Sequence, residues 1–157
     1  MRHPLSLLLA AMAAAVPLSG AMAQDGPSAE ERALEIRQGH MLNYAANLGV
    51  LGAMAQGNAD YDAAAATVAA ENLLYLASID QGHYWLPGTA QGEIEDSAAL
   101  PALWENRDDL RAKQQALLEA VTAMQGAAGT DLASLQAAMG PVGQACGACH
   151  EAYRAKE

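Results

Sequence analysis

The sequence is poor in bulky aromatic side chains and in basic ones. It has no Phe, and Phe, Trp and Tyr together make up 4% of its 157 residues. Because a protein interior must still reach close packing, either a large flat cofactor supplies the missing volume or Ala-rich helices pack closer together. Eight basic residues stand against 18 acidic ones, which gives a net charge of −10. This charge argues against nucleic acid and anionic lipid, and it fits either basic protein partners or simple solubility.

Long apolar runs are also scarce, and one stands at the N-terminus. Arg2 and His3 precede an apolar run over 5–18, which ends in the small-x-small sequence Ala21-Met22-Ala23. This pattern predicts a cleaved signal peptide over 1–23 and export to the periplasm. No later segment has roughly 18 consecutive apolar residues. We therefore expect 24–157 to form one domain that is not held in a membrane after cleavage.

The remaining sequence has the patterns of helices and no convincing strand. Ser28 and Glu31 form a capping box, and apolar residues recur every seven positions in the first and third segments. Four such segments with sustained apolar repeats predict an all-α fold, a left-handed antiparallel four-helix bundle. A long connection over 81–100 carries Pro87, Gly88 and Gly92, and loops of this length are often functional. The expected helices cover 28–56, 62–79, 101–125 and 131–153.

The apolar sides of these segments predict which residues face the core. The third helix presents Leu103, Leu110, Leu117 and Met124, and the second presents Val68, Leu73, Leu76 and Ile79. The fourth segment has the most regular register of all, and both cysteines lie on it, so both should face the interior. Gly140-Pro141 predicts a kink or a fresh helical start within this helix. The fourth register comprises Leu132, Leu135, Met139, Val142, Cys146, Cys149 and Tyr153.

The strongest chemical signal is the motif Cys146-Gly147-Ala148-Cys149-His150. Residues three apart on a helix differ by about 60° around the axis and about 4.5 Å along it, so both thiols can reach one porphyrin edge. Gly147 and Ala148 are small enough for a macrocycle to approach. His150 can then supply a neutral imidazole to the iron. The C-x-x-C-H motif therefore predicts one covalently attached haem c, with His150 as axial ligand.

Three other interpretations of the motif are weaker. A disulfide is compatible with an exported protein. A thioredoxin-like redox pair needs a preceding strand and a helix N-terminus that lowers the thiol pKa, and the pattern offers neither. A zinc site needs four ligands, whereas residues 24–157 contain two Cys and three His that are scattered along the sequence. Two of these histidines, His40 and His83, are also weak candidates for an iron ligand.

The motif near the C-terminus of a four-helix bundle resembles the class II c-type cytochromes, the cytochrome c′ family. The flanking Glu151-Ala152-Tyr153-Arg154 shares this resemblance, as do Arg37-Gln38 and Pro101-Ala102-Leu103-Trp104. The resemblance implies that Arg37 and Gln38 lie against the haem and its propionates, with Arg154 beside His150. It also places Gly88-Thr89 near the haem edge. Without the family resemblance, we would expect Arg37 and Arg154 to be solvated surface charges.

The resemblance also places Met41 opposite His150, and Met41 decides between two functions. If its sulfur binds iron, the protein is a six-coordinate, low-spin electron carrier. If it only covers the site, the haem is five-coordinate and admits a small diatomic such as nitric oxide, which is the interpretation we favour. An enzyme is not expected, because no distal His/Arg acid–base pair is present. Redox proteins are the expected partners, and a homodimer through the first two helices would use Ala63 to Ala66, Ala69 and Ala70 unless these pack inside the monomer.

Overall fold

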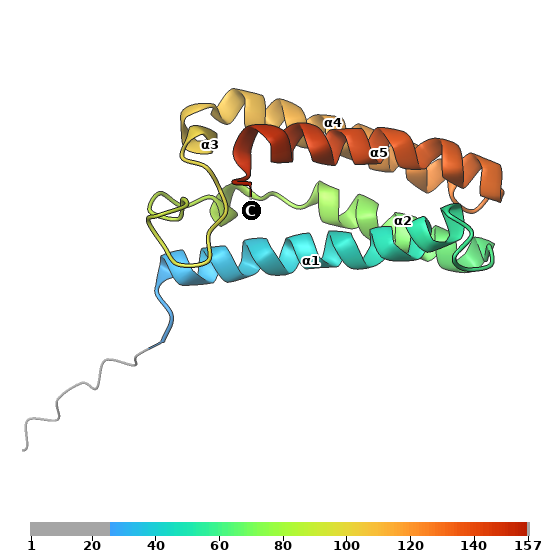
Figure 1. Cartoon of the computed structure of the whole chain (residues 1–157), viewed down its shortest axis with the longest axis horizontal. Helices are drawn as coiled ribbons and strands as arrows, with labels where there is room; N and C mark the ends of the chain where they lie inside the picture. Colours follow the sequence, from blue (N-terminus) through green and yellow to red (C-terminus); the bar gives the residue numbers. More distant parts are fainter. Residues whose placement is uncertain (1–25, 157) are drawn as a thin grey trace, which may run out of the picture.

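The computed structural model describes residues 26–156, and the predicted signal peptide lies outside this range. The described chain is helical, without a strand, and is drawn in Figure 1. No helix in this part is both long and apolar enough to cross a membrane. The elements are α1 (Ala29–Ala55), α2 (Ala63–Ser78), the 3-10 turn η1 (Gly82–Tyr84), α3 (Ala102–Glu105), α4 (Arg107–Ala127) and α5 (Leu132–Tyr153).

Three of the long helices begin at side-chain caps, as their sequences indicate. Ser28 and Glu31 form the predicted capping box at α1, with the Ser28 N–H donating to Glu31 at 2.6 Å. Asp62 Oδ1 accepts from the Ala64 and Ala65 amides at the start of α2. Asp131 caps α5 by accepting from the Ser134 amide at 2.7 Å. Such caps satisfy amides that have no partner within the helix, and so they fix where each helix starts.

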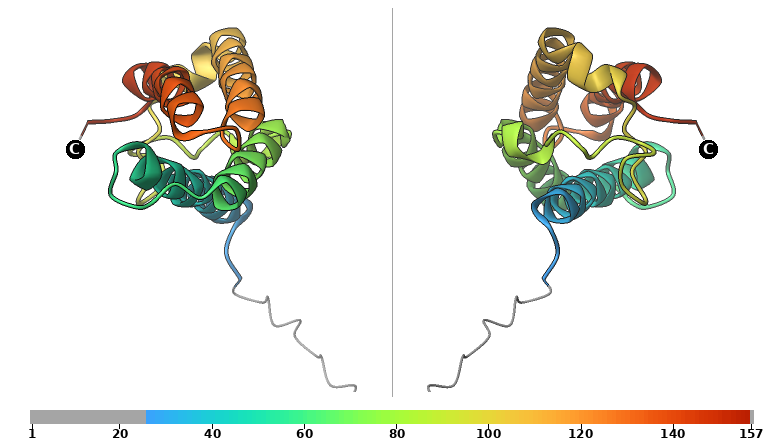
Figure 2. Two further views of the ribbon diagram at one scale, coloured as in Figure 1. Left: turned by 90° about the vertical axis from the view of Figure 1, so that its right-hand side faces the viewer. Right: turned by 90° about the vertical axis from the view of Figure 1, so that its left-hand side faces the viewer.

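The four long helices form the expected antiparallel four-helix bundle, which confirms the predicted fold class (Figures 1 and 2). Each helix packs on two neighbours, in the cyclic order α1, α2, α4, α5, and α1 and α5 are the least closely packed pair. The start of α1, the connection from α2, α3 and the end of α5 all lie at one end of the bundle. The chain segments that carry the predicted site therefore meet at this end, called here the site end.

The prediction of a single third helix is wrong, because the structure has two helices in this segment. α3 covers Ala102–Glu105, and Asn106 leaves helical geometry at φ −120° and ψ 49° before α4 begins. The Asn106 side chain donates back to Ala102 O at 2.8 Å, and Asp108 and Asp109 follow in the first turn of α4. These residues favour a helix start. Leu103 and Leu110 both remain buried against Tyr153, so the apolar repeat continues across the break.

α5 runs from Leu132 to Tyr153 with Pro141 inside it, so of the two outcomes predicted at Gly140-Pro141, a kink or a fresh helical start, the fresh start is wrong. Gly140 precedes the proline and has no Cβ to clash with its ring. Ala137, whose carbonyl loses its helical partner, is solvent-exposed, and water can replace the missing donor. The apolar register of α5 is confirmed, because none of its seven residues is exposed.

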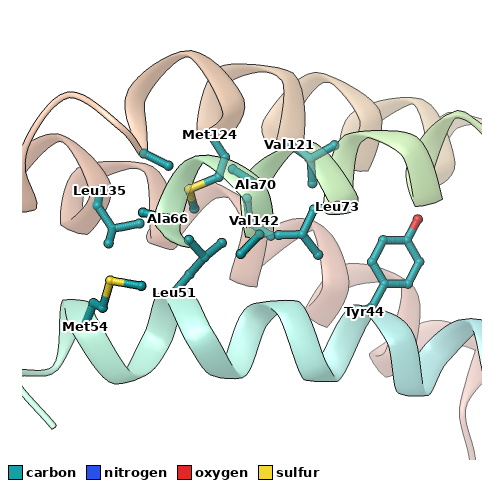
Figure 3. Close-up of a cluster of buried hydrophobic side chains, with 12 residues drawn as sticks. Tyr44, Leu51, Met54, Ala66, Ala70, Leu73, Val121, Met124, Leu135 and Val142 are labelled. Atoms are coloured by element: carbon teal, nitrogen blue, oxygen red, sulfur yellow. The ribbon is translucent and has the colours of Figure 1, made fainter. Parts of the chain in front are cut away.

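The closed half of the core lies toward the end of the bundle opposite the site end. Leu51 from α1, Leu73 from α2, Val121 from α4 and Leu135 from α5 are each fully buried and converge there (Figure 3). The predicted inward side of α2 is partly wrong. Val68 and Ile79 are 57% and 44% exposed, while several alanines of α2 are buried. Small side chains let α2 approach its neighbours closely. The large apolar side chains of α2 were therefore a poor guide to which of its residues are buried. The buried alanines are Ala66, Ala69 and Ala70.

Candidate functional site

A cavity of about 700 Å³ opens at the site end of the bundle, where α1 and α5 are least closely packed. This volume lies within the range of cofactor pockets, about 300–1,000 Å³. α1, α4 and α5 form its walls, and the connection after α2 closes its edge. Apolar side chains dominate the lining, among them Leu34, Leu48, Leu103, Leu110 and Leu117.

All three reactive side chains of the motif line this cavity from α5: Cys146, Cys149 and His150. Both thiols are free and half-buried. Burial raises the pKa of both, so they are not the low-pKa thiols of a redox pair. Partial burial, and then the charge of Arg154, lower the pKa of His150, which favours the neutral imidazole that binds metals. No group of three or more His, Cys, Asp or Glu suited to a metal occurs within residues 26–156, so the zinc interpretation gains no support.

The wall formed by α1 carries Met41 and Leu42. Met41 is 36% exposed and Leu42 is 70% exposed, and both line the cavity. Met41 is the one methionine among the described lining residues. Met41 lies on α1 and His150 lies on α5, so the two side chains reach the cavity from different helices. Apolar side chains exposed inside a cavity favour an apolar occupant.

Arg37 enters the cavity edge from α1 and is 5% exposed, so the surface-charge interpretation of this residue is wrong. Its guanidinium donates to Thr89 O and Ser97 Oγ at 3.1 Å, to Thr89 Oγ1 at 3.2 Å and to Tyr84 O at 3.4 Å. It also lies 4.8 Å from the centre of the Trp85 ring. Burial lowers its pKa. Among the described residues no carboxylate forms an ion pair with Arg37, so its buried charge is held by neutral oxygens.

The other predicted edge residues lie at the same end. Gln38 is exposed, lines the cavity, and donates from Nε2 to Asp96 O at 3.1 Å. Arg154 also lines the cavity, and its amide donates to His150 O at 3.0 Å as α5 ends. An antiparallel bridge joins Arg154 to Ala99 of the connection. The structure thus brings Arg37, Gln38 and Arg154 together around one cavity edge.

The two other histidines of the described chain lie away from the cavity lining. His40 is buried, with Nε2 3.3 Å from Gln81 Nε2 and its ring edge-on to Tyr44 and Tyr84. Burial lowers its pKa. His83 is exposed and stacks edge-on against Tyr84, with 4.4 Å between ring centres. Neither is positioned as an iron ligand.

Sequence reasoning missed two lining residues whose polar atoms are buried without a hydrogen-bond partner. They are Tyr44, through its hydroxyl, and Trp85, through its indole Nε1. Tyr44 follows Met41 by three positions and therefore shares its helix face, which was a usable signal. Trp85 lies in the irregular connection, where no periodicity predicts orientation. Buried polar atoms normally have partners, so these two indicate polar groups of an occupant.

The cavity fits a haem by several independent features. Its volume and apolar walls suit a porphyrin, the two thiols of α5 suit the attachment edge, and the imidazole of His150 suits the iron. The unpaired charge of Arg37 and the unpartnered N–H of Trp85 suit carboxylates at the other edge. When bound, the haem supplies an iron centre that changes oxidation state and accepts ligands.

A helical bundle with a C-x-x-C-H motif at the cavity wall on its last helix has the architecture of a class II c-type cytochrome. The family model described as cytochrome C' matches residues 32–154. The chain therefore belongs to the cytochrome c′ family, whose members carry covalently bound haem c.

Individual relatives agree with this assignment. Cytochrome c-554 of Cereibacter sphaeroides is 51% identical over 87% of this chain and 89% of its own. Cytochrome c' of the same organism is 40% identical over 96% of this chain and 97% of its own. The solved structure of cytochrome c' from Rhodobacter Spheriodes is 39% identical, covers 83% of this chain and 100% of its own, and has a TM-score of 0.80.

Proposed function

We propose that the protein is a periplasmic haem c protein that transfers electrons, binds a small diatomic molecule such as nitric oxide, or does both, and is not an enzyme. Cys146 and Cys149 would hold the haem by thioether bonds and His150 would be its axial ligand. The observation that carries this proposal is that these three side chains and Met41 line one cavity from α5 and α1. Export rests on the N-terminal sequence, and a mature mass lacking 1–23 in the periplasmic fraction would test it.

Within this proposal Met41 covers the open face of a five-coordinate haem. Its partial exposure beside the more exposed Leu42 favours a side chain that can give way to a small ligand. Relatives also support gas binding, because one solved structure is the nitric oxide complex of a variant of cytochrome c' from Alcaligenes xylosoxidans, 34% identical to this chain. Another is a carbon monoxide-bound variant of the same protein.

The alternative is a six-coordinate electron carrier in which Met41 is the sixth ligand. One observation favours it, namely that Met41 is the methionine placed in the cavity lining. Iron ligation by His and Met raises the reduction potential and would suit electron transfer alone.

Optical spectra of the purified holoprotein and of Met41→Ala separate the two functions. The five-coordinate proposal expects a high-spin spectrum in both proteins and carbon monoxide binding by the reduced wild type. A methionine-to-iron charge-transfer band in the oxidised wild type that disappears in Met41→Ala would establish the alternative. Leu42→Ala is the matched control, because it trims a neighbouring lining side chain that has no sulfur.

We further propose that Arg37, Gln38 and Arg154 form the propionate side of the haem site. Arg37 is buried without a carboxylate partner among the described residues, and a propionate would supply the missing counter-charge. The Trp85 N–H adds a donor at the same edge. Arg37→Met should therefore shift the reduction potential of the haem, because it changes the charge beside it, whereas Arg32→Met on the exposed side of α1 should not.

We also propose a homodimer through α1 and α2. Tyr75, Val68 and Ile79 form one exposed stripe on α2, at 68%, 57% and 44% exposure, and Val50 on α1 is 44% exposed. An Asn72 to Asn47 hydrogen bond of 2.9 Å joins the two helices along this face. Of the alanines expected at this contact, Ala66, Ala69 and Ala70 are buried inside the monomer, whereas Ala63 and Ala64 are exposed. One related structure is described as a cytochrome c' with a ligand-controlled dimer dissociation.

Sedimentation of the holoprotein at micromolar concentration tests the dimer. Tyr75→Glu should convert dimers to monomers, because it places a charge in an apolar contact. Ala116→Glu on the exposed side of α4 is the charge control and should leave the dimer intact. A wild type that sediments as a monomer would end this proposal without affecting the haem site.

A further inference from the structure

Tyr44 has an unusual environment for a tyrosine in a protein interior. Its side chain is 6% exposed and belongs to the cluster of buried apolar side chains that includes Leu73 and Val142. Yet it also lines the site cavity, and its hydroxyl has no hydrogen-bond partner in the described structure. Figure 3 shows the hydroxyl pointing away from the closed core cluster. Because buried tyrosine hydroxyls usually find a partner, a partner is expected from the cavity side.

Gln81 is the polar neighbour of this hydroxyl in the same cavity, and its Nε2 lies 3.3 Å from His40 Nε2. Gln81 also acts on the Tyr44 hydroxyl in the direction that lowers its pKa, but no hydrogen bond of ordinary geometry joins the two side chains. The His40 ring meets Tyr44 edge-on, with 4.9 Å between ring centres, which is an aromatic contact and leaves the hydroxyl unbound. The phenol pKa is raised to about 12, first by burial and then by the nearby Cys146, so the phenol stays protonated. It is thus available as a donor.

The position of Tyr44 on α1 puts its hydroxyl on the same side of the cavity as Met41. Tyr44 follows Met41 by one helical turn on α1, and both line the cavity. His150 reaches the cavity from α5, so the side of the iron opposite His150 would face α1. We propose that the Tyr44 hydroxyl donates a hydrogen bond to the diatomic molecule bound there, and thereby selects ligands whose outer atom carries partial negative charge. This inference rests on the proposed five-coordinate function.

The test compares holoprotein variants with carbon monoxide as the probe of the reduced protein. Tyr44→Phe retains the ring and removes only the hydroxyl, so folding should be unaffected. Loss of a hydrogen bond to the ligand should raise the carbon–oxygen stretching frequency and speed carbon monoxide dissociation roughly 2- to 10-fold. Tyr61→Phe is the matched control, because it removes a tyrosine hydroxyl that donates to Ala128 O outside the cavity lining, and it should change neither quantity.

An unchanged stretching frequency in Tyr44→Phe would overturn the inference. If Gln81→Leu changes the frequency where Tyr44→Phe does not, Gln81 is the donor. Failure of the five-coordinate proposal is a separate result, seen as a low-spin wild type that binds no carbon monoxide. In that case the same comparison between Met41→Ala and Met41→Ala/Tyr44→Phe still decides the role of Tyr44.

Discussion

Replacing Arg37 by Met should destabilise the protein mainly by releasing the connection between α2 and α3. The guanidinium joins α1 to three points of that connection, Tyr84, Thr89 and Ser97, through four hydrogen bonds. Met has similar length and fills much of the same space, so the change removes the hydrogen bonds and the charge without leaving a large cavity.

The magnitude follows from what each acceptor loses. Thr89 O still accepts from Ser97 Oγ at 2.7 Å, and Thr89 Oγ1 still donates to Leu86 O at 2.8 Å, so these groups stay partly satisfied. Tyr84 O loses the donor that the structure gives it. Each hydrogen bond from a charged donor contributes about 1.5–3 kcal/mol to stability. Their loss is partly offset, because the variant no longer has to bury a cation. We expect a net loss of about 2–4 kcal/mol, or about 6–15 °C in Tm for a domain of this size.

Two measurements check this prediction on the holoprotein. Thermal unfolding should show the fall in Tm, and amide hydrogen exchange should accelerate over 84–99 more than elsewhere, because local release precedes global unfolding. Arg32→Met, five residues earlier on α1 and exposed, should change stability by less than about 0.5 kcal/mol. If Arg37→Met and Arg32→Met unfold at the same temperature and exchange alike over 84–99, the role assigned to Arg37 is refuted.

Three further predictions concern other contacts. Gly129→Ala should cost about 1–3 kcal/mol in urea unfolding, because its Cβ would overlap Thr67 Oγ1, and adding Thr67→Ala should restore most of the loss. Tyr153→Phe removes the 2.5 Å hydrogen bond to Asp109 that joins α5 to α4, and should cost about 1–3 kcal/mol by the same assay. Because burial raises the pKa of Tyr44 to about 12, its contribution to stability should be complete below pH of about 10 and be lost as the pH rises toward 12, a loss absent in Tyr44→Phe.

The sequence predicted those parts of the fold that depend on local chemistry and regular spacing. Ser28, Asp62 and Asp131 carry cap side chains that act within three residues, so the helix starts could be identified from sequence. The register of α5 was also predicted correctly, because one helix face must stay apolar over its whole length. The motif from Cys146 to His150 needed only helical geometry to bring its side chains together.

Features that depend on several elements at once could not be predicted. The apolar repeat from Leu103 to Leu110 continues across Asn106 and concealed the break between α3 and α4. The inward side of α2 is set by how closely its neighbours approach, which favoured alanines over Val68. Arg37 was expected at the haem edge from family resemblance, but its bonds to the connection arise from residues 47–60 positions away. No local pattern contains such pairings.

The bundle accommodates its shortage of bulky side chains in two ways, one in each half. In the closed half, Ala66, Ala69 and Ala70 are buried and let the helices approach closely. At the site end the helices stay apart around a cavity of about 700 Å³. The site end should therefore depend on the haem far more than the closed half does.

A protein without haem, made as Cys146→Ala/Cys149→Ala, tests this difference. Loss of the occupant exposes apolar lining side chains such as Leu34 and Leu103, whereas the contacts among Leu51, Leu73 and Val121 stay as they are. Hydrogen exchange should accelerate in the first half of α1 and the last half of α5, and remain slow around Leu51 and Val121. Uniform acceleration through all four helices would show instead that the bundle folds as one cooperative unit around the haem.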